Sequence, residues 1–127
     1  MELIAIVSGL ALIQAFIFAF QVGKARGTYG VSAPAISGDE NFERMFRVHQ
    51  NTLELLILFI PAIWMFGYYV SAEIGAGIGV VFIIARQVYK SAYLGNPKGR
   101  AAGFGLSALS MMILLIGGMI GAGMAYF

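Results

Sequence analysis

Long apolar stretches, separated by short polar segments, dominate this chain. They cover residues 3–22, 53–70, 74–93 and 104–127. Each is close to the ~20 residues that a helix needs to cross the ~30 Å hydrocarbon layer of a membrane. The strands of a membrane barrel would alternate polar and apolar residues, whereas runs such as MMILLIGGMIGAGMAYF do not alternate. The pattern therefore predicts an all-α integral membrane protein with four transmembrane helices.

The connections between the apolar stretches are short, and the sequence shows no internal repeat. We therefore expect residues 1–127 to form a single membrane domain, an up-down-up-down bundle of four helices. The third helix should end near Gly95, Asn96 and Pro97, because Gly and Pro stop helices. A fourth helix should begin near Lys98.

The first apolar stretch has some features of a signal peptide, but two observations argue against one. Glu2 stands where a signal peptide carries basic residues, and the apolar run exceeds the ~7–15 residues of a usual signal core. We therefore expect this stretch to be retained as a transmembrane helix.

The first connection, GKARGTYGVSAPAISGDE (residues 23–40), is rich in Gly, Ser and Pro and predicts an irregular loop. Ser37 and Glu40 have the spacing of a capping box, and the acidic residues Asp39 and Glu40 suit the positive end of a helix dipole. The second helix should therefore start near Asp39, outside the membrane, and enter the bilayer around residues 51–54.

Charged residues make up only 11% of the chain, while 60% of its residues are hydrophobic. Soluble domains average about 25% charged residues, so this composition excludes an ordinary soluble protein.

All eight Lys and Arg residues flank the first and third connections: Lys24, Arg26, Arg44, Arg47, Arg86, Lys90, Lys98 and Arg100. The positive-inside rule places that face in the cytoplasm and both termini on the opposite side. A basic cluster is also typical of nucleic-acid binding, but four membrane spans favour lipid over nucleic acid as the partner.

The chain contains no cysteine and a single histidine, His49. It can therefore form no disulfide, no cysteine nucleophile and no thiolate metal site, and one histidine cannot build a histidine-rich metal site. We expect no metal cofactor, and any reactive sulfur must belong to a ligand.

Glycines are frequent in the third and fourth apolar stretches. Gly117 and Gly121 have the small-xxx-small spacing that lets two membrane helices approach closely. This spacing is compatible with packing inside one subunit and with association between subunits.

A polar stripe opens the second helix. Arg44, Arg47, Asn51 and Glu54 follow steps of three, four and three residues, so they share one helix face. Arg47 and Glu54 lie about 10 Å apart along the axis, which we expect to be too far for a direct ion pair. Because an ionisable group at membrane depth needs a partner, two interpretations remain. One is an ion network in which an arginine of another helix neutralises Glu54; the other is a polar ligand whose carboxylate binds Arg47 and whose ammonium binds Glu54.

The third helix presents a matching face near the same end. Arg86, Tyr89 and Tyr93 follow the i, i+3, i+7 spacing of one helix side. The tyrosines are compatible with an aromatic belt at the membrane surface or with a ligand site. Arg100, just beyond Pro97, has three candidate roles: snorkelling to the interface, binding lipid phosphate, or placing a fixed charge over the same pocket.

These residues resemble a known family. The segments FERMFRVHQNTLELLILF and ARQVYKSAYLGNPKGR are similar to the MAPEG family, the membrane-associated proteins in eicosanoid and glutathione metabolism. The pattern E-R-x-x-R-x-x-x-N-x-x-E and the later Tyr-x3-Tyr-x6-Arg carry the resemblance, which extends over nearly the whole chain. The segment RVHQNTLE most resembles the microsomal glutathione transferase branch.

The resemblance implies a homotrimer with active sites between adjacent subunits, open to the cytoplasmic side and to lipid. It also implies glutathione as co-substrate and an apolar electrophile that arrives from the bilayer. The implied glutathione contacts are Arg26, Arg47, His49, Asn51, Glu54, Tyr89 and Tyr93, with Arg26 and His49 supplied by the neighbouring subunit. The implied catalytic residue is Arg100, whose guanidinium stabilises the thiolate without titrating itself.

Two further comparisons refine what the resemblance implies. His49 projects about 200° away from Arg47 on a helix, so the two cannot share a pocket within one chain, which is consistent with a two-subunit site. Leu55 and Gly27 stand where leukotriene C synthase has a tyrosine and a second arginine. We therefore expect a broader glutathione transferase, or a glutathione-dependent peroxidase of lipid hydroperoxides, in preference to leukotriene synthesis.

Two other functions stay open. Small four-helix multidrug transporters have a similar length, but their acidic residue is expected inside the first helix, where this chain has Gln14. A non-catalytic lipid-binding member of the family is the second alternative, although the complete set of glutathione contacts argues against it.

Overall fold

Four long helices account for almost the whole molecule. The computed structural model describes residues 1–127. Its elements are α1 (Glu2–Tyr29), α2 (Glu40–Tyr69), α3 (Ala72–Gly95), the short 3-10 helix η1 (Pro97–Arg100) and α4 (Ala101–Tyr126). Each of the four long helices is long and apolar enough to cross a membrane. The prediction of an all-α membrane protein with four transmembrane helices is confirmed.

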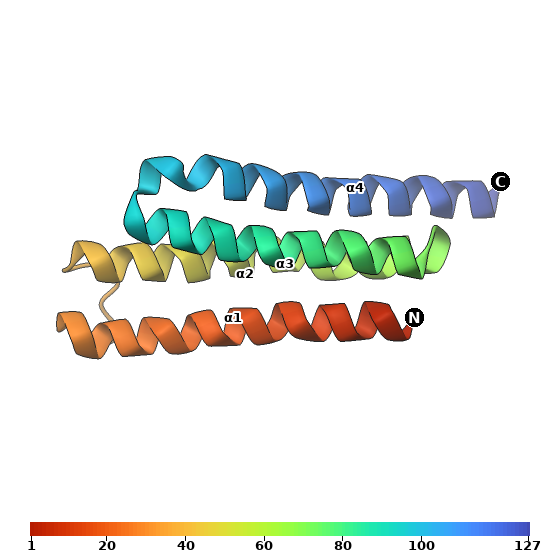
Figure 1. The fold of residues 1–127 in the computed structure, drawn as a ribbon. Coiled ribbons are helices and arrows are strands. Elements are labelled where there is room, and N and C mark those ends of the chain that lie inside the picture. The colour runs from red at the N-terminus through yellow and green to blue at the C-terminus, as the bar shows by residue number, and fades with distance from the viewer.

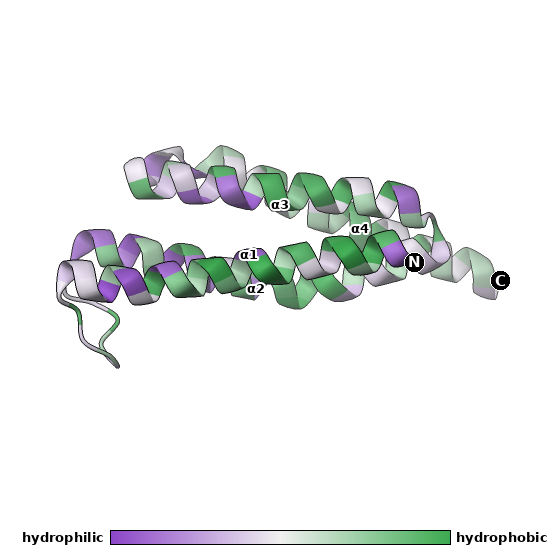
Figure 2. Ribbon diagram, turned by 60° about the horizontal axis from the view of Figure 1, so that its bottom comes forward, coloured by the Kyte–Doolittle hydropathy of each residue, from purple (hydrophilic) through white to green (hydrophobic).

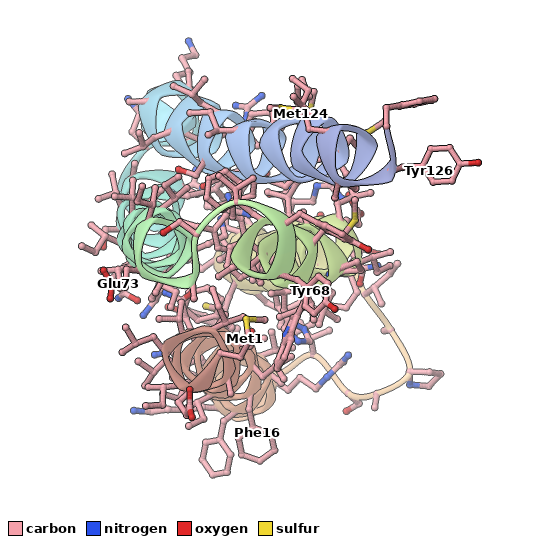
Figure 3. The ribbon with its side chains drawn as sticks, turned by 90° about the vertical axis from the view of Figure 1, so that its right-hand side faces the viewer. Met1, Phe16, Tyr68, Glu73, Met124 and Tyr126 are labelled. Carbon is pink, nitrogen blue, oxygen red and sulfur yellow. The ribbon has the colours of Figure 1, made fainter.

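Consecutive helices run antiparallel, as the short connections predict (Figure 1). Both termini and the α2–α3 connection lie at one end of the bundle, and the α1–α2 loop and the α3–α4 connection lie at the other (Figure 1). The helices α2 and α3 occupy the middle, with α1 and α4 on opposite sides of them (Figures 1 and 3). The residues of the site described below come from α2, α3, α4 and the short helix η1.

The interior of the bundle is apolar, and so is most of its exterior. Phe59 of α2 stacks on Phe82 of α3 with ring centroids 4.0 Å apart, and neither side chain is exposed. On the outer face of α1, Phe16 is 71% exposed and points away from the other helices (Figure 3). Removing such aromatic side chains from water lowers the free energy of the protein. This surface therefore requires lipid or another subunit against it.

Polar residues concentrate at the end of the bundle that carries the α1–α2 loop (Figure 2). There α1 continues as a helix to Tyr29 and ends at Gly30, whose φ of 71° is left-handed and suits a residue without a side chain. The prediction of an irregular loop over residues 23–40 is therefore wrong for its first part, because helical hydrogen bonds continue through residues 23–29; the irregular loop is residues 30–39. The 3-10 turn begins at Pro97 and α4 at Ala101, near the predicted start at Lys98.

The second helix begins where the sequence predicts, but a different residue caps it. Asp39 Oδ1 accepts hydrogen bonds from the backbone N–H groups of Asn41 (2.8 Å) and Phe42 (3.0 Å). The predicted capping box of Ser37 and Glu40 is wrong, because Asp39 directly precedes the first helical residue and its carboxylate reaches the free N–H groups.

The Gly117-x-x-x-Gly121 spacing serves packing inside the chain. A Cβ atom at Gly117 would lie 2.7 Å from Cε2 of Phe66, and one at Gly121 would lie 2.9 Å from the carbonyl oxygen of Tyr69. Both glycines therefore face α2 of the same chain and let α4 approach it closely. Of the two interpretations of this motif, the structure supports packing within one subunit.

Candidate functional site

The polar stripe of α2 contains an ion pair along its own helix. Arg47 Nη1 lies 3.3 Å from Glu54 Oε1, and both side chains are 50% exposed. The expectation that these residues are too far apart is wrong, because both side chains extend along the helix axis and together span about two turns. Within the chain, Glu54 is therefore paired on its own helix and forms no ion pair with an arginine of another helix.

The tyrosines of α3 face the inside of the bundle. Tyr89 is only 3% exposed and belongs to the buried cluster that also contains Phe42 and Met45 of α2. The Tyr93 ring lies 5.5 Å from the Tyr89 ring and is partly exposed. Because a tyrosine of an aromatic belt faces lipid, the burial of Tyr89 argues against that interpretation.

Arg100 is positioned by the short 3-10 helix between α3 and α4. Asn96 Oδ1 accepts a hydrogen bond from the Lys98 N–H (3.2 Å), which caps the turn. At the end of the same turn, Arg100 Nη1 donates to the carbonyl oxygen of Pro97 (2.6 Å), and its guanidinium lies 5.8 Å from the centre of the Tyr93 ring. The position beside Tyr93 is consistent with a fixed charge over the pocket, and the choice among the three candidate roles stays a prediction.

A cleft of about 490 Å³ collects these side chains at the polar end of the bundle. Its lining residues come from α2, α3, η1 and α4: Arg47, Asn51, Glu54, Tyr89, Tyr93, Arg100 and Phe104. Six of them were predicted from the sequence as site residues. Phe104 was not, although it follows Arg100 by four residues and so shares its helix face. It supplies the apolar wall of the cleft, with its ring 6.4 Å from that of Tyr89.

Two of the predicted site residues lie outside this cleft. Arg26 donates to the carbonyl oxygens of Ala35 (2.7 Å) and Val31 (3.4 Å), so within its own chain it holds the α1–α2 loop. His49 is partly buried elsewhere on α2. Their participation in a site therefore depends on a second copy of the chain and stays a prediction.

Arg86 occupies a place that the sequence did not predict. It was grouped with the charges that flank the third connection and with the face of Tyr89 and Tyr93, yet its side chain is fully buried and does not line the cleft. Its Nη1 donates to Oδ1 of Asn51 (2.7 Å). The only sequence signal was the i, i+3 spacing to Tyr89, over whose ring the guanidinium lies.

Leu55 follows the last residue of the polar stripe and turns away from it. Its side chain is 8% exposed and belongs to the apolar core that includes Phe59 and Phe82. The chain therefore offers no hydroxyl to the cleft from this position.

The cleft combines groups of both charges in a small volume. Two guanidinium groups can bind carboxylates or stabilise an anion, one carboxylate can bind an ammonium, and an amide and two phenols can form hydrogen bonds. This set of groups matches a small zwitterionic ligand with more anionic than cationic groups.

Comparisons with known proteins agree on one family. The model of the MAPEG family matches residues 4–120. Microsomal glutathione S-transferase 2 of Bos taurus is 40% identical over 119 residues, which cover 94% of this chain and 82% of the relative. An uncharacterized protein of Synechocystis is 40% identical over 116 residues (91% and 85%), and leukotriene C4 synthase of Rattus norvegicus is 34% identical over 104 residues (82% and 69%).

Proposed function

Because this chain belongs to the MAPEG family, we propose that it is a membrane-bound glutathione transferase. The single observation that carries the proposal is the composition of the cleft, in which Arg47, Glu54 and Arg100 lie together. Glutathione carries two carboxylates, one ammonium and a thiol, so it presents a complementary partner for each of these groups. The names of the relatives, a glutathione S-transferase and a leukotriene C4 synthase, support the same chemistry.

In this proposal each residue has one role. Arg47 binds a carboxylate of glutathione and Glu54 binds its ammonium, while Asn51, Tyr89 and Tyr93 form hydrogen bonds to the peptide. Arg47 Nη1 and Glu54 Oε1 lie 3.3 Å apart, so the ion pair between them orients both charges toward the cleft that they line.

Arg100 stabilises the reactive sulfur. A free thiol has a pKa near 8.5, so at neutral pH only a small fraction is thiolate, which is the nucleophile. A guanidinium beside the sulfur lowers the pKa of the thiol, because it stabilises the anion and keeps its own proton. The thiol proton passes to solvent, the sulfur forms a bond to the electrophilic carbon, and the leaving group departs with the electron pair of the bond that breaks.

The electrophile arrives from the membrane. The surface around the bundle is apolar, with Phe16 and Phe20 more than 70% exposed on α1 (71% and 72%). Apolar substrates partition into a bilayer and concentrate there, while glutathione enters from the polar end. We propose that the cleft lies where water and bilayer meet, on the cytoplasmic side by the positive-inside rule.

Mixing glutathione with the purified protein tests the function directly. Stopped-flow absorbance should show a thiolate signal that saturates with glutathione concentration, and product should form when 1-chloro-2,4-dinitrobenzene is added. Ophthalmic acid, which lacks the thiol but keeps the carboxylates and the ammonium, should compete for binding and give no signal. If the protein neither binds glutathione nor gives a thiolate signal with it, the non-catalytic lipid-binding alternative becomes the better account.

Replacing Glu54 with Gln should weaken glutathione binding by about tenfold, because the ion pair between carboxylate and ammonium becomes a hydrogen bond from the ammonium to an uncharged amide oxygen. The free energy of unfolding should change by less than about 1 kcal/mol, since half-exposed ion pairs contribute little. Isothermal calorimetry and thermal unfolding measure the two effects. Glu73→Gln is the matched control, because Glu73 is exposed at the opposite end of the bundle (Figure 3), and it should leave glutathione binding unchanged.

We also propose a homotrimer whose sites receive Arg26 and His49 from the neighbouring subunit. Arg26→Ala and Arg100→Ala should each lower activity when every subunit carries the change. Trimers mixed from the two variants should regain part of the activity, because some interfaces then combine an intact Arg26 with an intact Arg100. Mixed trimers as inactive as the parent variants would contradict a site shared between subunits.

A further inference from the structure

A buried arginine stands directly behind the cleft. The Arg86 side chain has no exposed surface, and none of the ion pairs in the chain includes it. Its Nε and Nη2 atoms are buried without a partner in the chain. Because a buried charge without a counter-ion is costly inside a membrane protein, such a residue calls for a functional explanation.

The contacts of Arg86 connect two residues of the cleft. Its Nη1 donates to Asn51 Oδ1 on α2 at 2.7 Å, and its guanidinium carbon lies 4.2 Å from the centre of the Tyr89 ring on α3. A cation at this distance over an aromatic ring is attracted to the face of the ring by a cation–π interaction. The Arg86 side chain therefore contacts one cleft residue of α2 and one of α3, and it does not itself line the cleft.

The hydrogen bond to Arg86 determines how the Asn51 amide is oriented. A guanidinium has five N–H donors and no acceptor, so the amide atom that it contacts must be the oxygen. The Asn51 nitrogen, with its two N–H donors, is then the amide atom left for a ligand. Asn51 is 7% exposed and lines the cleft, so this orientation decides what it offers there.

We propose that Arg86 is a positioning residue that makes Asn51 a hydrogen-bond donor to an acceptor oxygen of glutathione, a carboxylate or a peptide carbonyl. The inference rests on the proposed function. It excludes the opposite arrangement, in which Asn51 would accept a hydrogen bond from a peptide N–H of the ligand. Arg86 acts through Asn51 and does not itself touch the substrate.

A double-mutant cycle on the full-length protein tests the positioning role. Asn51→Ala and Arg86→Met should each raise the Kd of glutathione by about tenfold, and the double variant should bind no more weakly than Asn51→Ala alone. Arg86→Lys keeps the charge and an N–H donor for Asn51, so it should stay within about threefold of the wild type. Losses that multiply in the double variant, or wild-type affinity in Arg86→Met, would overturn the inference.

Asn51→Asp tests the direction of the hydrogen bond, and it stays informative if Arg86→Met does not fold. An aspartate accepts the hydrogen bond of Arg86 and gives the buried guanidinium a counter-charge, so the unfolding temperature should equal or exceed that of the wild type. It offers no donor to the ligand, so the Kd of glutathione should rise by at least about tenfold. Wild-type affinity in Asn51→Asp would overturn the assignment of Asn51 as a donor.

The failure of this inference can be told apart from the failure of the proposed function. A wild-type protein that binds no glutathione contradicts the proposed function itself. A wild-type protein that binds glutathione and shows the thiolate signal, together with independent effects of Arg86 and Asn51, contradicts the positioning role alone.

Discussion

Arg100→Ala should lower kcat for glutathione conjugation by about a hundredfold or more and change the Kd of glutathione by less than about fivefold. The guanidinium lies at the end of η1, 5.8 Å from the centre of the Tyr93 ring, and lines the cleft. In the proposed function it interacts with the sulfur, whose charge matters for attack, whereas Arg47 and Glu54 bind the ends of the peptide. Loss of the sulfur contact therefore affects turnover more than binding.

The pH dependence of the rate gives a second readout for Arg100. Without the guanidinium the pKa of the bound thiol should rise toward about 8.5, the value of a free thiol. The rate of Arg100→Ala should therefore keep rising with pH up to that region, while the wild-type rate should level off at lower pH. Stopped-flow absorbance of the thiolate measures the pKa of both proteins.

Two variants serve as controls for Arg100. Lys98→Ala removes the neighbouring cation of η1, which does not line the cleft, and should leave kcat within about twofold. Arg100→Lys keeps the charge but loses the planar guanidinium, and should have intermediate activity. An unchanged kcat in Arg100→Ala, or a loss confined to glutathione binding, would remove Arg100 from the catalytic role.

Gly103→Ala should disrupt the contact between α3 and α4 at the level of the cleft. A Cβ atom at Gly103 would lie 2.6 Å from the backbone nitrogen of Tyr89 and 2.7 Å from its Cα atom. Backbone atoms cannot move aside as a flexible side chain can, so α4 must shift away from α3. We expect a loss of about 1–3 kcal/mol in the free energy of unfolding, typical of overpacking. We also expect at least tenfold lower activity, because the shift separates Phe104 and Arg100 from Tyr89.

Gly105→Ala is the matched control in the same helix. A Cβ atom there meets nothing within 4 Å, and alanine favours the helical state by up to about 1 kcal/mol over glycine. This variant should therefore be as stable as the wild type or slightly more stable, with unchanged activity. Equal behaviour of the two alanine variants, in thermal unfolding and in turnover, would show that the close approach at Gly103 is unimportant.

The helical period predicted much of the candidate site but not its contacts. The spacing of Arg47, Asn51 and Glu54 placed them on one face, and the cleft contains all three. The same reasoning misjudged the Arg47–Glu54 distance, because it counted axial rise and not the reach of two extended side chains. It also left Arg86 with the surface charges, since periodicity gives the direction of a residue around its helix and not what packs against it there.

The sequence by itself determined the class of the protein. Apolar stretches of membrane-spanning length, few charges and short connections allow little besides an antiparallel bundle of transmembrane helices, because these are local properties of length, polarity and chain reach. The segregation of the Lys and Arg residues likewise marked the polar end, where the cleft lies.

Only the tertiary structure decided how that polar end is used. It placed α2 and α3 in the middle with α4 beside them, buried Arg86 behind Asn51 and Tyr89, and brought Arg100 from η1 over Tyr93. It also showed that Gly117 and Gly121 serve packing on α2 of the same chain. These outcomes depend on which helix faces meet and at what height, and such pairings join residues far apart in the sequence that no local pattern relates.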